Sequence, residues 1–117
     1  PTRGGLSTIL NEISNRAGLS VKLMEESIPI EREVYAVNEM LGLDPLYMAC
    51  EGRIVLVVKG EMAEEILNKL HNLEQCGNAS IIGNFTEDLE HMVYMENSFG
   101  GTRILNILDG EMLPRIC

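Results

Sequence analysis

The stretch Leu6-Ser-Thr-Ile-Leu-Asn-Glu-Ile-Ser-Asn-Arg-Ala-Gly-Leu-Ser-Val-Lys-Leu23 joins a helix signal to a strand signal through a glycine. Its apolar residues fall on one helical face as far as Ala17, which predicts an amphipathic helix. Gly18 stands where such a helix commonly ends, because glycine adopts the left-handed conformation without a steric penalty. The run from Val21 to Leu23 that follows predicts a strand.

Two further helices are expected beyond this stretch. One covers 31–41, since acidic residues fill its first turn and Gly42 stands at its end. The other is amphipathic, runs from Ala63 to Leu73, and is followed by Gly77. Between them, Asp44-Pro45 marks a loop.

The remaining apolar runs predict four strands. Arg53-Ile-Val-Leu-Val-Val-Lys59 is β-branched and apolar throughout, which is typical of a central strand buried on both faces. The runs 80–86 and 91–96 are expected to be antiparallel across a short polar turn, and 102–108 forms a last strand. The order of elements predicts an α/β (α+β) fold, a layered mixed β-sheet packed with helices. Residues 1–109 form this domain, and 110–117 are interpreted as a flexible tail.

The net negative charge of the chain argues against polyanionic binding partners. Its 117 residues include 18 acidic and 9 basic residues, for a formal net charge of -9. A phosphate backbone or an anionic membrane surface repels such a chain, which argues against nucleic-acid and membrane binding. The three cysteines are widely spaced and odd in number, so a disulfide framework is not expected and a reducing cytoplasm is the natural setting.

Cys117 is the first candidate for chemistry, because a thiol at the last position has little backbone around it to bury it. Its reactive form is the thiolate, and an unperturbed thiol of pKa about 8.5 is only a few per cent ionised at neutral pH. At about 3.3 Å per residue, an extended segment from Gly110 to Cys117 spans roughly 23 Å, which lets one sulfur visit two sites. The alternative is a disordered terminal residue that happens to be cysteine.

The segment Pro1-Thr-Arg-Gly-Gly5 is a candidate anion site immediately before the first helix. Gly4 and Gly5 allow close backbone approach, and a helix N-terminus offers free N–H groups. Arg3 adds a bidentate clamp for phosphate or carboxylate, beside the hydroxyl of Thr2. An ordinary helix start with a glycine turn explains the same residues equally well.

Glu51 is a candidate general base, since it precedes the predicted strand 53–59 and is flanked by Gly52. Partial desolvation there would tune its carboxylate, although most such glutamates are solvated loop residues. No metal site is predicted, because Cys50, Cys76, His71 and His91 lack the spacing of metal ligands. The two internal cysteines are interpreted as small apolar core or near-core residues.

Three segments together resemble the HypE family of nickel–iron hydrogenase maturation factors. Residues 1–13 resemble the start of the family's second domain, and Gly42-Leu-Asp-Pro-Leu-Tyr-Met-Ala-Cys-Glu-Gly52 resembles its central loop. Gly100-Gly-Thr-Arg-Ile-Leu and the terminal Leu113-Pro-Arg-Ile-Cys117 resemble its ending, which is the most specific part. The resemblance covers essentially the whole chain and implies the C-terminal domain of a PurM-like (AIR synthetase) protein.

The resemblance implies an ATP-dependent carbamoyl dehydratase. The carbamoyltransferase HypF places a carbamoyl group on the terminal thiol, and ATP then activates the carboxamide oxygen as a leaving group. A base removes a proton from nitrogen, which leaves a thiocyanate on sulfur. The cyano group passes to iron held by a HypC–HypD scaffold.

Carried over by position, Cys117 matches the carrier cysteine, and Glu51 matches the glutamate of an Asn-Glu-Gly loop. Thr2, Arg3, Gly4 and Gly5 match a loop near the nucleotide cleft, and Cys50 departs from the family by standing where asparagine is common. The family binds ATP with Mg mainly in an N-terminal domain, which is absent from this chain, and is a homodimer at full length. This chain is therefore expected to be a piece of a longer protein and inactive alone.

Two other functions stay open. The domain is either a catalytic part of the dehydratase or a non-catalytic interaction domain that presents its tail to maturation partners. A third alternative is another PurM-like synthetase or kinase domain that acts on a small metabolite. The effect of replacing Glu51 on dehydration distinguishes the first two functions. An activity that survives replacement of Cys117 would favour the third.

Overall fold

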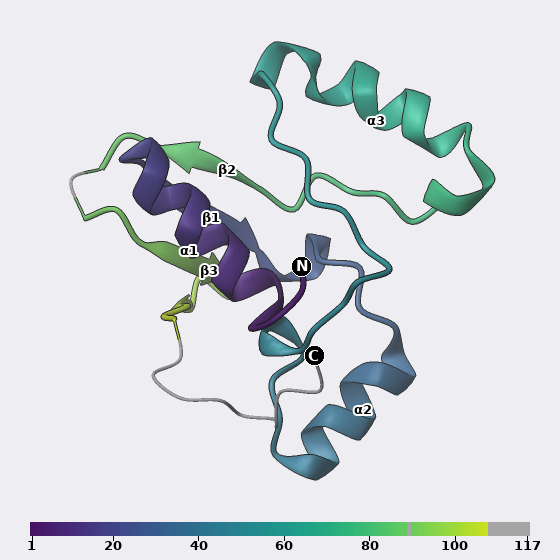
Figure 1. The fold of residues 1–117 in the computed structure, drawn as a ribbon, viewed down its shortest axis with the longest axis vertical. Coiled ribbons are helices and arrows are strands. Elements are labelled where there is room, and N and C mark those ends of the chain that lie inside the picture. Colours follow the sequence, from purple (N-terminus) through teal and green to yellow (C-terminus); the bar gives the residue numbers. More distant parts are fainter. Residues whose placement is uncertain (89, 108–117) are drawn as a thin grey trace.

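A computed structural model describes residues 1–88 and 90–107 of the chain. Three α-helices and four strands form its framework, joined by short 3₁₀ turns (Figure 1). In chain order these elements are α1 (Gly5–Ala17), β1 (Ser20–Met24), α2 (Arg32–Leu41), α3 (Ala63–His71), β2 (Gly83–Thr86), β3 (Val93–Glu96) and β4 (Thr102–Ile104). The three predicted helices and the strand after Gly18 are thereby confirmed.

The four strands form one mixed sheet in the order β2-β1-β3-β4. β1 pairs antiparallel with β2 and parallel with β3, and β3 pairs antiparallel with β4. The predicted α+β class with a mixed sheet is therefore confirmed. The direct pairing expected between 80–86 and 91–96 is wrong, because β1 lies between β2 and β3 and takes up the hydrogen-bonding edge of each.

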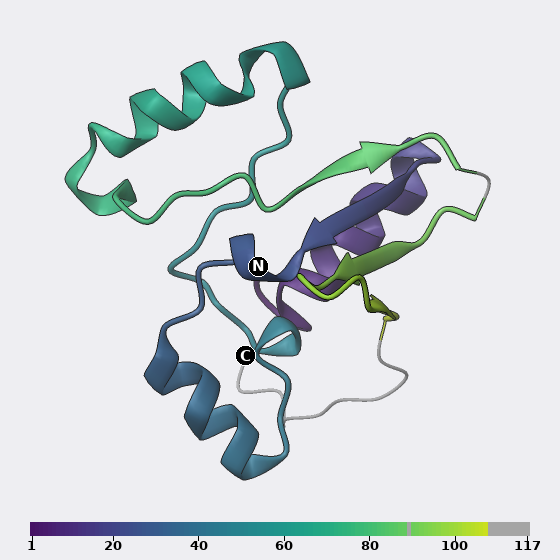
Figure 2. The same cartoon turned by 180° about the vertical axis from the view of Figure 1, so that it is seen from behind.

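α1 begins and ends at glycines in the left-handed conformation. Gly4 has φ 70° at its N-terminus, and Gly18 has φ 65° at its C-terminus, where its N–H donates to the carbonyl of Ser14. The helix lies along one face of the sheet (Figures 1 and 2). Its apolar stripe packs there on a core of residues that are at most 4% exposed: Leu10, Val21, Leu23, Leu46, Val93, Met95 and Leu105.

Polar groups on α1 hold the chain after β4 against the helix. Asn11 Nδ2 donates to the carbonyl of Leu105 at 2.7 Å and to its own helix at Ser7. The hydroxyl of Ser7, which is fully buried, donates to the carbonyl of Asn106 at 3.3 Å. These side chains satisfy carbonyls that follow the last strand and would otherwise be desolvated without a partner.

The predicted central strand at 53–59 is absent from the described sheet. The segment is extended coil, and Ile54 is 85% exposed. Its β-branched apolar residues signalled a need for burial, but the sequence did not reveal where the covering surface lies. The central position is occupied by β1, which has partners on both sides.

Residues 53–82 form a projecting arm on one side of the body (Figure 2). The arm contains the segment 53–59, η3 (Gly60–Met62), α3, η4 (Glu74–Cys76) and the return toward β2. The main contacts of α3 are with η3 and η4, the turns that flank it. None of the described helices has the length and apolar character needed to cross a membrane.

We expect Asn11→Ala to lower the free energy of unfolding by about 1–3 kcal/mol, because it leaves the Leu105 carbonyl without its partner. Asn15→Ala is the matched control, since Asn15 is exposed on the same helix. Chemical denaturation of both variants measures the difference. Equal stability of the two variants would contradict the role assigned to Asn11.

The loop between β2 and β3 predicts a loss of stability in acid. Asp88 accepts hydrogen bonds from the Ser20 and Thr86 hydroxyls and from the Glu90 amide. These bonds, that from Ser20 foremost, hold the pKa of Asp88 below its ordinary value of 3.8. A lowered folded-state pKa means that the stabilisation is present above the unfolded-state pKa and is lost as pH falls through the folded-state value.

Urea midpoints measured across acidic pH test this expectation. Asp88→Asn should flatten the acid limb of the stability curve. Glu87→Gln, at an exposed neighbouring carboxylate, should leave that limb unchanged. An acid limb that is equally steep in Asp88→Asn and in the unmodified chain would show that Asp88 does not couple protonation to folding.

Candidate functional site

The start of α1 lies against the backbone of the loop 46–48. Gly5 has φ 60°, and a Cβ placed on it would stand 2.5 Å from the carbonyl oxygens of Leu46 and Met48. No other residue fits at this position without moving the loop, because both neighbouring atoms belong to backbone. Gly5 is thus the residue that allows the two segments to touch.

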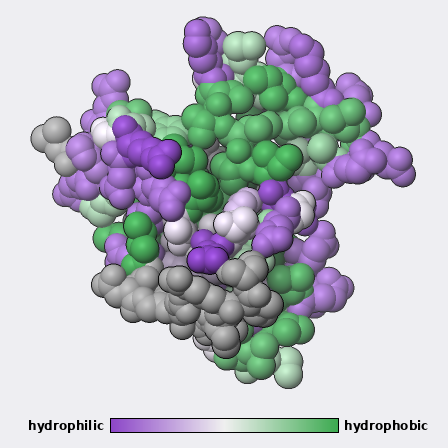
Figure 3. All heavy atoms as spheres, in the orientation of Figure 1, coloured by the Kyte–Doolittle hydropathy of each residue, from purple (hydrophilic) through white to green (hydrophobic). Residues whose placement is uncertain are grey.

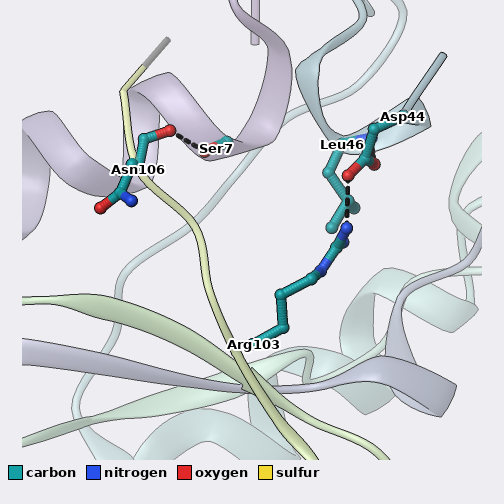
Figure 4. A network of polar contacts seen from close by, with 5 residues as sticks. All are labelled: Ser7, Asp44, Leu46, Arg103 and Asn106. Carbon is teal, nitrogen blue, oxygen red and sulfur yellow. Dashed lines mark hydrogen bonds and ion pairs between the residues drawn. The ribbon is translucent and has the colours of Figure 1, made fainter.

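The loop that Gly5 contacts is held in place at its other end by Asp44. One carboxylate oxygen of Asp44 accepts from the amide of Leu46 at 2.9 Å, which caps the turn η2 (Pro45–Tyr47). The other accepts from Arg103 Nη1 on β4 at 2.6 Å (Figure 4). Leu46 itself is buried in the core. The loop is therefore fixed both to the sheet and to α1.

A backbone hydrogen bond joins the two predicted site segments. The amide of Cys50 donates to the carbonyl of Pro1 at 2.9 Å, and the amide of Arg53 closes a turn onto the carbonyl of Cys50 at 3.2 Å. Glu51 lies inside that turn and is therefore next to the segment that leads into α1. The structure brings together the predicted base and the predicted anion-binding segment, which are far apart in sequence.

Glu51 and Cys50 are both exposed. The interpretation of Cys50 as a core residue is therefore wrong: its backbone is tied to Pro1 at the surface, whereas the core is filled from α1, the sheet and Leu46. Cys76 is partly buried at the end of η4. No group within the described residues covers Glu51, so desolvation of its carboxylate would require cover from outside these residues.

An open pocket of about 240 Å³ lies beside the start of α1. Its lining combines the predicted Thr2 and Arg3 with Thr8 and Glu12, which lie one helical turn apart on α1. Sequence reasoning missed Thr8 and Glu12, although their spacing of four residues was a signal that they share a face with the helix start. Gly4 and Gly5 shape the backbone beside this pocket and do not line it.

The residues around this pocket fit a phosphate group. Arg3 supplies a cation, and Thr2 and Thr8 supply hydroxyls. Glu12 is the exception, since a carboxylate repels an anion unless a cation lies between them. The donor set therefore has the chemistry of an anion site, which Glu12 opposes.

A second pocket of about 670 Å³ opens between α2 and the end of the sheet. Tyr35 and Glu39 line it from α2, and Met95 and Arg103 line it from the sheet. It contains none of the residues predicted to carry chemistry. Within 1–88 and 90–107, no group of three or more His, Cys, Asp or Glu residues could hold a metal ion. Cys117 and the predicted tail 110–117 lie outside the described residues.

Comparisons with known proteins place the chain in a family. The model of the family "AIR synthase related protein, C-terminal domain" matches residues 1–96. The carbamoyl dehydratase HypE of Azotobacter vinelandii is 44% identical over all 117 residues, which make up 34% of that protein. The chain thus spans about a third of the length of the curated relatives that it matches.

Solved structures agree with this match. A crystal structure of the hydrogenase maturation protein HypE in complex with ATP is 38% identical, with a TM-score of 0.90 over 100% of this chain and 36% of that one. A HypE–HypF complex is 34% identical, with a TM-score of 0.87 over 92% of this chain and 35% of that one.

These matches confirm the resemblance that the terminal segments and the central loop indicated. The chain belongs to the family of AIR synthase related protein C-terminal domains, and its relatives include HypE proteins.

Proposed function

We propose that this chain is the C-terminal domain of an ATP-dependent carbamoyl dehydratase that acts in hydrogenase maturation. The whole-chain similarity to a protein of that name supports the reaction. The observation that carries the assignment to residues is the hydrogen bond from Cys50 to Pro1, which sets Glu51 beside the start of α1. A proton acceptor and a set of phosphate-binding donors then share one edge of the domain.

In this proposal each residue has one task. The thiol of Cys117 carries the carbamoyl group, whose conversion to a thiocyanate removes the carboxamide oxygen and two protons. ATP, when bound, supplies the phosphoryl group that turns this oxygen into a leaving group. One nitrogen proton leaves to solvent when the oxygen is phosphorylated, and Glu51 accepts the other as the C–O bond breaks. Thr2 and Arg3 orient the phosphate, and Gly4 and Gly5 form the positive-φ turn that presents this segment at the start of α1.

The relatives suggest how the domain obtains its substrates. HypE has been solved with ATP and in a complex with HypF, so we propose HypF as the carbamoyl donor and ATP with Mg as the phosphoryl donor. A HypC–HypD scaffold as acceptor, a homodimer of the full-length protein and a cytoplasmic location follow from the family resemblance. We propose that most of the ATP site lies in the part of the full-length protein that this chain does not span, and we therefore expect the chain alone to be inactive.

A second candidate function is presentation of the tail without catalysis by this domain. The exposure of Glu51 favours it, because a solvated carboxylate is a weak base for a nitrogen-bound proton. The two candidates differ in whether Glu51 matters once the carbamoyl group is on Cys117.

We expect Glu51→Gln in a full-length chain carrying this sequence to slow thiocyanate formation about 10²- to 10⁴-fold, since the amide accepts no proton. Glu87→Gln is the matched control, because Glu87 is exposed in the loop after β2 and belongs neither to the site nor to the projecting arm. Single-turnover assays on protein already carbamoylated at Cys117 isolate this step. Undiminished turnover by Glu51→Gln would favour tail presentation.

Intact-mass and peptide spectrometry on the full-length protein tests the carrier thiol. With HypF and carbamoyl phosphate, a carbamoyl mass should appear on Cys117 and should lose the mass of one water once dehydration is allowed. Cys76→Ser should retain both masses, and Cys117→Ser should lose both. Modification of Cys50 in place of Cys117 would overturn the assignment.

A further inference from the structure

The projecting arm, residues 53–82, carries an apolar surface that the described residues leave uncovered. Ile54 is 85% exposed, Leu56 and Val57 are each 56% exposed, and Met62 and Leu73 add to the same arm. Figure 3 shows apolar side chains gathered over the upper part of the molecule, where the arm lies. Contiguous exposed apolar surface of this kind marks an interaction site more often than a solvated face.

The arm is held together by its own polar contacts. Arg53 Nη1 donates to Asn78 Oδ1 at 3.1 Å, and the ring of His71 is 2.8 Å from the carbonyl of Ala79. The hydroxyl of Ser80 donates to the carbonyl of Ser27 at 2.5 Å, which ties the base of the arm to the body. These bonds organise the two limbs of the arm while the apolar side chains remain directed outward.

The backbone of 54–58 is also unpaired within the described part of the chain. A turn ends at the Arg53 amide and another begins at the Lys59 carbonyl, and no backbone hydrogen bond is made by the residues between them. The segment is extended, and Val55 packs partly on the core. An extended β-branched segment with free N–H and C=O groups has the properties of a strand edge that accepts a neighbouring strand.

We propose that residues 54–58 form an interdomain strand edge, covered by the part of the full-length polypeptide that this chain does not span. The relatives are about three times as long, so a covering segment of the same polypeptide is available in them. The whole chain, arm included, has a TM-score of 0.90 against a HypE chain of which it covers only 38%. The backbone is therefore similar in a longer protein that contains the additional polypeptide.

Tethering favours the same polypeptide over a second copy as the occupant. The formal net charge of -9 adds a general repulsion between copies, which the homodimer proposed for the full-length protein must overcome at whatever surface it uses. A segment of the same polypeptide avoids most of the entropic cost of association, because it is tethered at a high effective concentration. The segment that covers residues 54–58 should therefore belong to the same polypeptide and present an apolar surface with an exposed strand edge. The inference rests on the match to longer relatives and is independent of the proposed dehydration chemistry.

Hydrogen exchange measured on this chain and on a full-length chain carrying it tests the proposal. The amides of Ile54 to Val58 should exchange rapidly in this chain and should be protected at least about tenfold in the full-length protein. The amide of Glu87, an exposed residue after β2 whose N–H has no partner among the described residues, is the internal control and should exchange rapidly in both. Protection in the full-length protein should persist through about a hundredfold dilution, because a tethered contact does not depend on concentration.

A matched pair of variants adds a second readout. Leu56→Asp should lower the melting temperature of the full-length protein by several degrees while leaving this chain almost unchanged, and Phe99→Asp should alter neither. Protection that disappears on dilution would assign the surface to a second copy and overturn the proposal. Equally rapid exchange of 54–58 in both chains would overturn it too, and would leave the surface to a separate partner protein.

Discussion

The missing side chain at Gly5 is the constraint on which the rest of the domain depends. Because no Cβ is present, the first turn of α1 lies directly on the carbonyls of Leu46 and Met48. That contact sets Leu46 into the core and lets the loop reach Pro1 through the amide of Cys50. The Asp44–Arg103 ion pair then joins the same loop to β4. Three distant parts of the sequence meet at one backbone contact.

Local patterns predicted the helices because each helix is specified within its own residues. The apolar stripe of α1 and the glycine at its end needed no knowledge of the remaining chain. The sheet was harder, since pairing depends on segments that are far apart. Residues 53–59 had the composition of a central strand, yet β1 holds that position with an alternation of buried and half-buried residues. The face of β1 away from α1 carries the Lys22–Glu96 ion pair, and among the described residues α1 is the helix that covers the sheet.

The sequence predicted which residues belong to the candidate site, but it did not predict how they are arranged in space. The motifs at 1–5 and 42–52 predicted Arg3 and Glu51 as site residues. The two segments lie close together because Gly5 lets α1 contact the 46–48 loop, and spacing along the sequence does not predict such a contact. Glu12 was missed because a charged residue on a helix is ordinarily a solvated one. The environment of the Glu51 carboxylate could not be inferred from this chain at all, since nothing within its described residues covers it.

The position of β1 between β2 and β3 has a consequence for the order in which the domain folds. β1 is made early in the chain, but both of its neighbours follow α2 and the whole arm. During synthesis the strand therefore emerges long before either partner exists, and α1 is the described element of this chain that precedes it and can pack on Val21 and Leu23. Closing such long loops carries an entropic cost before any pairing is gained, which makes for slow folding. The amphipathic first helix accordingly serves as a temporary cover for an unpaired strand until residue 96 has emerged from the ribosome.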